Sequence, residues 1–199
     1  MSVLVGKQAP DFAATAVFGN NEIKELKLSD YRGQYVVLFF YPLDFTFVCP
    51  SELIAFDHRL AEFQARNVQV IGVSIDSQFT HLAWKNTPVN KGGIGQVGYP
   101  LVADLKHEIC QAYDVEFGAA GVAFRGSFLI DKDGVVQHQV VNNLPLGRNV
   151  DEMLRMVDAL QFVEEHGEVC PAGWNKGKAG MKPTPEGVAE YLATNAPAL

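Results

Sequence analysis

Two predominantly apolar runs predict the buried strands of a parallel sheet. They cover residues 36–41 and 68–75, and both are rich in β-branched and aromatic side chains, as is typical of strands covered on both faces. Between the runs, apolar residues recur at steps of three and four: Leu53, Phe56, Leu60 and Phe63. This stripe predicts an amphipathic helix. Strand, helix and strand in this order predict a right-handed crossover between parallel strands.

The second half of the chain predicts a hairpin followed by a long helix. Apolar-rich segments at 127–131 and 135–141 flank Lys132-Asp133-Gly134, and Asp-Gly between two such segments is a strong signal for an antiparallel hairpin. A helical pattern then starts near Arg148 or Asn149. Shorter helical patterns cover 77–85 and 104–113. This order of elements favours an α/β, thioredoxin-like fold with a central mixed β-sheet flanked by helices.

The last part of the chain has a different composition. From about Gly167 the pattern gives way to glycine, lysine and proline, and a short helical pattern returns only at 185–194. We therefore predict a thioredoxin-like domain at 1–166 and a C-terminal arm at 167–199.

Composition and charge exclude several classes of function. Hydrophobic residues make up 48% of the chain, charged residues 20%, and the net charge is -7, which argues against nucleic acid or an anionic membrane as partner. The N-terminal residues do not resemble a secretory signal, and no apolar run approaches the roughly 18 residues of a membrane span. We expect a soluble, cytoplasmic protein.

The three cysteines are candidates for chemistry. An odd number of cysteines in a reducing compartment argues against a disulfide framework. His107 and Cys110 share one helical face, but no second ligand pair accompanies them, so we predict no metal site. Cys110 also adjoins an apolar stripe and is interpreted as a packed core thiol. Each cysteine is then either an inert thiol or part of a redox catalyst.

The other two cysteines each stand in a Val-Cys-Pro tripeptide, in contrasting surroundings. Cys49 follows the first predicted strand, and because proline suits the first helical position, Pro50 places Cys49 at or beside a helix N-cap. Helix-end charge contributes at most about 2 kcal/mol toward a thiolate, too little by itself to ionise a free thiol at neutral pH. A cation is therefore expected nearby, and Arg125, just before a predicted strand, is the candidate. Cys170 lies in the arm.

The residues before Cys49 carry a resemblance to a known family. Pro-x-x-x-Thr-x-x-Cys, filled by Pro42, Thr46 and Cys49, resembles the active-site signature of the peroxiredoxins. The longer string from Phe40 to Glu52 is similar to that of the typical two-cysteine class, specifically the bacterial alkyl hydroperoxide reductase C group. The resemblance includes the arginine at 125 and the second Val-Cys-Pro, so it extends over nearly the whole chain.

The resemblance implies a thiol peroxidase that reduces hydrogen peroxide and organic hydroperoxides with no metal and no organic cofactor. It implies that Cys49 is the peroxidatic thiolate, that Thr46 orients the peroxide, and that Pro42 shields the sulfur from water. Arg125 would stabilise the thiolate and the leaving oxygen. Glu52 would position the arginine, although a favourable charge in the first helical turn explains it equally well.

The resemblance also implies the partners. Cys170 would be the resolving thiol, supplied by the partner subunit of a homodimer, and dimers would assemble into decamers. Electrons would come from thioredoxin or from a flavoprotein disulfide reductase. Two alternatives are a thioredoxin-like disulfide oxidoreductase, which the absence of Cys-x-x-Cys after Cys49 disfavours, and a ring-forming holdase chaperone.

Overall fold

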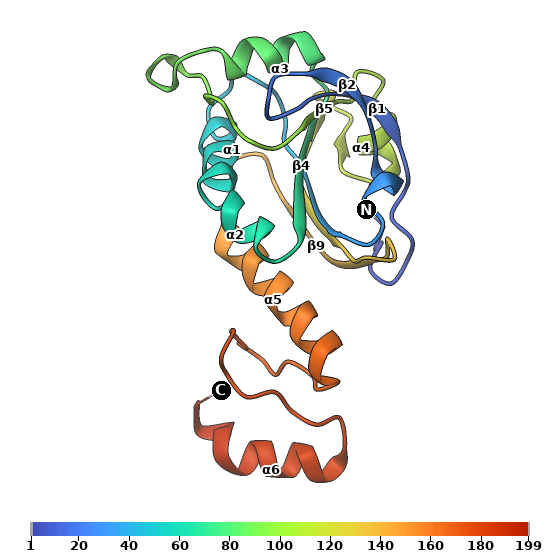
Figure 1. Ribbon diagram of the computed structural model, residues 1–199, viewed down its shortest axis with the longest axis vertical. Helices are drawn as coiled ribbons and strands as arrows, with labels where there is room; N and C mark the ends of the chain where they lie inside the picture. Colours follow the sequence, from blue (N-terminus) through green and yellow to red (C-terminus); the bar gives the residue numbers. More distant parts are fainter. Residues whose placement is uncertain (1, 199) are drawn as a thin grey trace. The chain divides into compact units, whose positions relative to one another are not determined.

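Nine short strands form two sheets in the computed structural model, which describes residues 2–198 (Figure 1). The strands are β1 Ala13–Val17, β2 Ile23–Lys27, β3 Tyr35–Phe40, β4 Val68–Ser74, β5 Leu101–Ala103, β6 Glu116–Phe117, β7 Val122–Ala123, β8 Arg125–Ile130 and β9 Val136–Asn142. Seven of them form the main sheet in the order β2-β1-β5-β4-β3-β8-β9, while β6 and β7 pair separately.

The helices connect and follow these strands. The α-helices are α1 Cys49–His58, α2 Leu60–Gln64, α3 Gln78–Lys85, α4 Glu108–Ala112, α5 Val150–His166 and α6 Pro185–Asn195. Short 3₁₀ turns occur at η1 Leu28–Tyr31, η2 Val89–Lys91 and η3 Ala196–Ala198. No helix within residues 2–198 combines the length and the apolar character needed to cross a membrane.

The pairing of the central strands confirms the predicted fold class. β3 and β4 pair in parallel, from Tyr35 opposite Val68 to Phe40 opposite Val73, as expected for strands joined by a helical crossover. β8 pairs antiparallel with both β3 and β9, so the predicted hairpin is present. The main sheet is therefore mixed and carries helices on both faces.

Alternation along β3 shows how the two faces are covered. Successive side chains of a strand point to opposite faces, and the Phe39 ring stacks on Phe56 of α1 with the ring centroids 4.3 Å apart. The neighbouring Phe40 contacts Tyr113, next to the end of α4, at 5.2 Å. Helices α1 and α4 thus cover opposite faces of the sheet (Figure 1).

Two helical predictions need correction. The continuous apolar stripe of 53–63 predicts a single helix, but Arg59, with φ -106° and ψ 5°, leaves the helical conformation and divides it into α1 and α2. The helix expected over 104–113 is confined to Glu108–Ala112. The Asp104 carboxylate accepts hydrogen bonds from the backbone N–H groups of Ile109 and Cys110, so Asp104 satisfies donors at the start of the helix.

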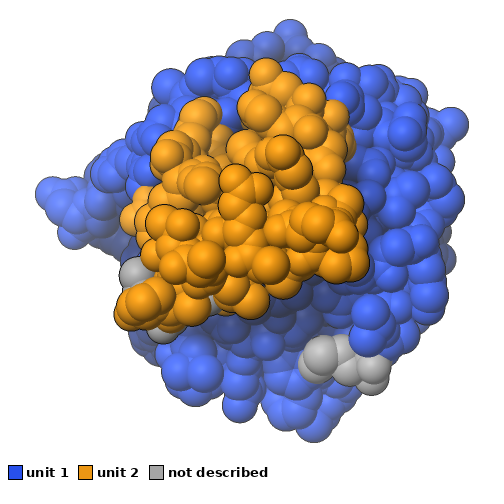
Figure 2. Space-filling model, turned by 90° about the horizontal axis from the view of Figure 1, so that it is seen from below, with its two compact units in different colours: residues 1–150 blue, residues 151–199 orange. Residues whose placement is uncertain are grey.

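The chain divides into two compact units, residues 1–150 and 151–199 (Figure 2). The first contains all the strands of both sheets. The second contains nearly all of α5, an isolated antiparallel bridge between Val169 and Met181, and α6, whose first turn is capped by the Thr184 hydroxyl. The functional boundary between 166 and 167 stays a prediction.

Candidate active site

Cys49 is the first residue of α1, and its side chain is fully buried. Val48 is the N-cap residue and Pro50 the second helical residue, one position later than the sequence suggested. The consequence is the same, because the N–H groups of the first turn have no partner within the helix and a proline removes none that is needed. The sulfur therefore belongs to the helix end at which negative charge is favoured.

Arg125 reaches this sulfur from β8. Its Nη1 lies 3.4 Å from the Cys49 Sγ and 2.5 Å from an oxygen of Glu52, while its Nε donates to the carbonyl oxygen of Leu144 at 2.7 Å. Only 4% of the Arg125 side chain is exposed. The Glu52 carboxylate and the Leu144 carbonyl oxygen thus hold its guanidinium in contact with the sulfur. A cation held in this way stabilises negative charge that develops on the atom it contacts.

A second arginine completes the cluster, and the sequence analysis missed its role. Arg148, noted there only as a residue near a helix start, donates from Nε and Nη2 to the two Glu52 oxygens at 2.8 and 3.0 Å. Its Nη1 donates to the carbonyl oxygens of Phe40 and Gly126. Burial lowers the pKa of Arg148, and the neighbouring Glu52 carboxylate opposes that shift.

The charges of this cluster leave a positive excess. Two arginines and one glutamate, Arg125, Arg148 and Glu52, sum to one net positive charge, and all three side chains are almost completely buried. A buried uncompensated charge is unfavourable. Negative charge that develops on the Cys49 sulfur during a reaction would offset this excess.

The loop between β3 and α1 carries two further predicted residues. Pro42 is buried, and Thr46 is partly buried and donates its hydroxyl hydrogen to the carbonyl oxygen of Leu43 at 2.8 Å. Because a hydroxyl has one donor and two acceptor sites, this bond leaves the Thr46 oxygen able to accept a hydrogen bond from a bound peroxide.

A buried hydrogen-bonded pair, also missed from the sequence, anchors the same loop. His81 Nδ1 lies 2.7 Å from Asp44 Oδ2, and Tyr41 donates its hydroxyl hydrogen to Asp44 Oδ1 at 2.9 Å. Burial raises the pKa of Asp44, while the hydrogen bond and charge of His81 oppose the shift. Nothing in the local pattern around Asp44 signals this pairing, because His81 lies 37 residues away.

Cys170 belongs to the second unit. Its Sγ lies 3.6 Å from the carbonyl oxygen of Ala159, and the preceding Val169 pairs with Met181. Burial raises the pKa of the Cys170 thiol, and Arg155 opposes the shift. All three cysteines are unpaired thiols.

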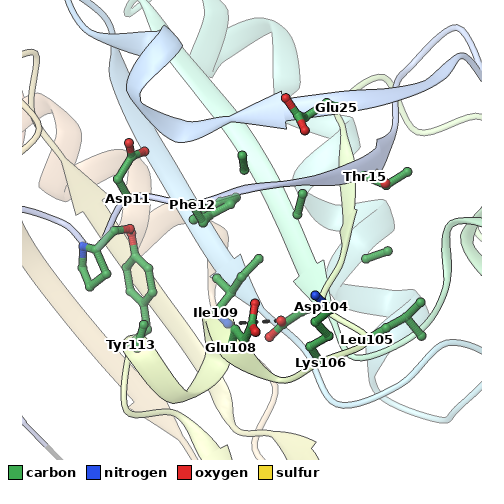
Figure 3. A pocket seen from close by; sticks show the side chains of 15 residues that line it. Asp11, Phe12, Thr15, Glu25, Asp104, Leu105, Lys106, Glu108, Ile109 and Tyr113 are labelled. Carbon is green, nitrogen blue, oxygen red and sulfur yellow. Dashed lines mark hydrogen bonds between the residues drawn. The ribbon is translucent and has the colours of Figure 1, made fainter.

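A cavity in the first unit lies away from the residues around Cys49. A cavity of about 440 Å³ lies between β1, β2 and α4, where its wall includes Phe12, Glu25 and Ile109 (Figure 3). None of the predicted site residues lines it. The candidate active site is therefore the cluster of Cys49, the two arginines and Glu52, and not this cavity.

A thiol at a helix start, paired with a buried arginine on a thioredoxin-like sheet, defines the class of thiol-dependent redox enzymes. Residues 5–139 match the AhpC/TSA family, and residues 159–194 match the C-terminal domain of 1-Cys peroxiredoxin. The chain belongs to the AhpC/TSA family.

Proteins similar to this chain include alkyl hydroperoxide reductases and peroxiredoxins. Alkyl hydroperoxide reductase C of Helicobacter pylori is 63% identical over 97% of this chain and 98% of its own length. Peroxiredoxin-2 of Bos taurus is 55% identical over 95% and 94% of the two chains. Among solved structures, the reduced 2-Cys peroxiredoxin of Plasmodium vivax covers 97% of this chain and 100% of its own, with a TM-score of 0.95 and 54% identity.

These similarities confirm the two-cysteine peroxiredoxin resemblance and the enzyme class. The chain is a thiol peroxidase with the thioredoxin-like fold of that family.

Proposed function

We propose that Cys49 is the peroxidatic nucleophile of this thiol peroxidase and that Arg125 is its main electrostatic partner. The observation that carries the proposal is the 3.4 Å contact between Arg125 Nη1 and Cys49 Sγ, with the same guanidinium held by Glu52 and Leu144. A preorganised donor of this kind stabilises charge as it develops without having to reorganise during the reaction.

The chemical step is a two-electron transfer to the peroxide. The Cys49 thiolate attacks one peroxide oxygen, the O–O bond breaks, and the other oxygen leaves as water or an alcohol after it takes up a proton. The sulfur is oxidised to a sulfenic acid. Arg125 stabilises the leaving oxygen, Thr46 accepts a hydrogen bond from the bound peroxide, and Pro42 closes the site to water.

Glu52 acts as a positioning residue. Its two oxygens accept from both arginines, including Arg125 at 2.5 Å and Arg148 at 2.8 Å. By joining them, the carboxylate fixes the direction in which Arg125 presents its Nη1 to sulfur. If Glu52 only supplied a favourable charge to the first turn of α1, it would not need to contact either arginine.

Resolution then forms a disulfide. The thiol of Cys170 of the partner subunit attacks the sulfenic sulfur, water leaves, and the two sulfurs join. Because bridged cysteines need Cα atoms within about 7 Å, and Cys49 is fully buried in the first turn of α1, that turn must unwind first. We place the resolving function in the arm predicted at 167–199.

Recycling needs two electrons from a dithiol. The candidate donors are thioredoxin and a flavoprotein disulfide reductase, and the working assembly is a homodimer that forms decamers. Peroxide consumption measured with each donor, combined with sedimentation of the reduced and oxidised protein, tests these parts separately. The cytoplasmic location stays a prediction.

A coupled peroxidase assay on three variants tests the role assignment. We expect no turnover for Cys49→Ser, one oxidation event without recycling for Cys170→Ser, and near-normal turnover for Cys110→Ser. Turnover in Cys49→Ser, or its loss in a folded Cys110→Ser protein, would overturn the assignment.

A further inference from the structure

A group of three potential metal ligands lies at the start of α4, outside the Cys49 site. His107 Nδ1 lies 2.6 Å from Glu116 Oε1, and Cys110 Sγ lies 3.3 Å from the carbonyl oxygen of His107. One ligand atom from each of the three residues can be chosen so that all lie within 4.8 Å of one another. The group shares no residue with the arginine and glutamate cluster around Cys49.

The fold brings these side chains together from two elements. His107 is the N-cap residue of α4, with its backbone in the left-handed region (φ 62°), and Cys110 lies three residues further along, inside the helix. Glu116 comes from β6, where it pairs with Ala123 of β7. The sequence shows only the first two, which is why it predicts no metal site; the third ligand becomes visible once the chain returns after α4.

The ligand types fit zinc. Histidine nitrogen, cysteine thiolate and carboxylate oxygen are the ligands that Zn²⁺ takes, and sites with three protein ligands leave a fourth position for water. Asp104 is not part of the group of three; its two oxygens accept the N–H groups of Ile109 and Cys110 at 3.1 and 2.8 Å.

The exposure of the three side chains would let a metal ion reach them from solvent. Cys110 is 1% exposed, whereas the His107 and Glu116 side chains are 26% and 23% exposed. A metal ion can therefore reach the group from solvent and contact the thiol at its base. The cavity shown in Figure 3, which Glu108 and Ile109 help to line, includes none of the three ligands among its lining residues.

Cys110 is buried close to two carboxylates, those of Asp104 and Glu116. Burial raises the pKa of Cys110 to about 12, and the nearby Asp104 and Glu116 carboxylates add to the shift. The thiol therefore keeps its proton at neutral pH and is a poor nucleophile. A divalent cation would reverse the local electrostatics and deprotonate the thiol on binding.

We propose that His107, Cys110 and Glu116 bind one Zn²⁺ ion, with water as the fourth ligand. Binding forms three bonds from the metal to the protein, and the Cys110 proton passes to solvent. The ion joins the start of α4 to β6, so it stabilises this corner of the domain. It does not take part in the reaction at Cys49.

Cobalt binding tests the site, because Co²⁺ occupies zinc sites and absorbs in the near ultraviolet when a thiolate binds it. The protein used is the full, untagged chain with Cys49→Ser and Cys170→Ser, so that Cys110 is the one thiol left. We expect one equivalent of Co²⁺ with a thiolate-to-cobalt band that Zn²⁺ displaces, and about one proton released per metal ion.

Three variants in this background locate the ligands. Cys110→Ala should lack the band and the proton release. His107→Ala and Glu116→Gln, which alter partly exposed side chains, should each weaken binding at least about tenfold, the lower range for disturbing even an outer-shell partner of a metal. Glu108→Gln, on the same helix and exposed, is the matched control and should bind like the background protein.

Several results would overturn the proposal. These are the absence of a thiolate band in the folded background protein, Co²⁺ affinity in Cys110→Ala equal to that of the background, or affinity unchanged in both His107→Ala and Glu116→Gln. Circular dichroism confirms folding of each variant. If Cys110→Ala is unfolded, the two partly exposed ligands decide the question.

Discussion

Replacing Arg125 by lysine tests how the buried guanidinium acts on Cys49. One arginine side chain serves three acceptors, the Cys49 sulfur, Glu52 and the Leu144 carbonyl, through two of its nitrogens. A lysine ammonium is a single point charge and lacks the planar fork. Arg125→Lys therefore keeps the positive charge but loses the geometry that aims it at sulfur.

The expected cost follows from the contact that is lost. A hydrogen bond involving a charged group contributes about 1.5–3 kcal/mol, and each 1.36 kcal/mol changes a rate tenfold. The second-order rate constant for oxidation of Cys49 by hydrogen peroxide should fall roughly 10- to 150-fold in Arg125→Lys.

Stopped-flow fluorescence measures this rate constant directly. The Trp84 ring lies 5.8 Å from the Phe45 ring, in the loop before Cys49, so its emission reports changes in that loop. Arg66→Lys, at an arginine that donates to the Glu62 carbonyl outside the site, is the control and should react like wild type. A folded Arg125→Lys protein that reacts within threefold of wild type would refute the reasoning.

A double-mutant cycle extends the test to Glu52. If Glu52 acts through Arg125, the effects of Glu52→Gln and Arg125→Lys will not add, and groups in one network typically couple by about 0.5–3 kcal/mol. Additive effects would contradict the positioning role of Glu52.

Three further predictions concern the surrounding residues. Arg148→Leu removes the hydrogen-bond donors to Glu52 and to the Phe40 and Gly126 carbonyl oxygens, and buried acceptors left unsatisfied cost about 1–3 kcal/mol each, so the free energy of unfolding measured with urea should fall by about 3 kcal/mol or more; a fall below 1 kcal/mol would contradict the contacts to Glu52. Thr46→Val should slow peroxide reduction about 2- to 10-fold through one lost hydrogen bond, whereas Thr46→Ser keeps the hydroxyl and should retain the wild-type rate; equal rates for both would contradict a role for the hydroxyl. The folded-state pKa of Cys110 is about 12 against an ordinary value of 9.0, so this thiol stabilises the fold below about pH 9 and that contribution is lost as pH rises toward 12. The free energy of unfolding, measured with urea, should therefore fall more steeply with pH in this range for the metal-free protein than for Cys110→Ala. Identical slopes would show that folding does not raise the pKa of the Cys110 thiol.

Local patterns in the sequence predict the centre of the fold well. The runs at 36–41 and 68–75 correspond closely to β3 and β4, and the Asp133-Gly134 turn joins β8 to β9. These elements are specified by side chains within a few residues of one another, through burial on both faces or through a turn. Short strands at the sheet edge, β1 and β2, have mostly exposed or partly exposed side chains in their first residues and carry a weaker pattern.

Contacts between residues far apart in the chain cannot be predicted from local sequence patterns. The motif around Cys49 predicts the reactive thiol because its residues are adjacent in the chain. Arg148 lies 96 residues from its partner Glu52, and an arginine near a predicted helix start has an ordinary explanation as a residue of the helix end. The sequence contains no local sign that Arg148 is buried, so its role emerges only from the folded chain.

Mass spectrometry of peroxide-treated protein tests the central claim most directly. Reduced protein is treated with one equivalent of hydrogen peroxide, alkylated, and digested without reducing agent. We expect a Cys49–Cys170 linked peptide in wild type and an oxidised Cys49 in Cys170→Ser, with Cys110 still a free thiol in both. An unmodified Cys49, or a linkage that joins Cys110 to either partner in place of the Cys49–Cys170 disulfide, would contradict it.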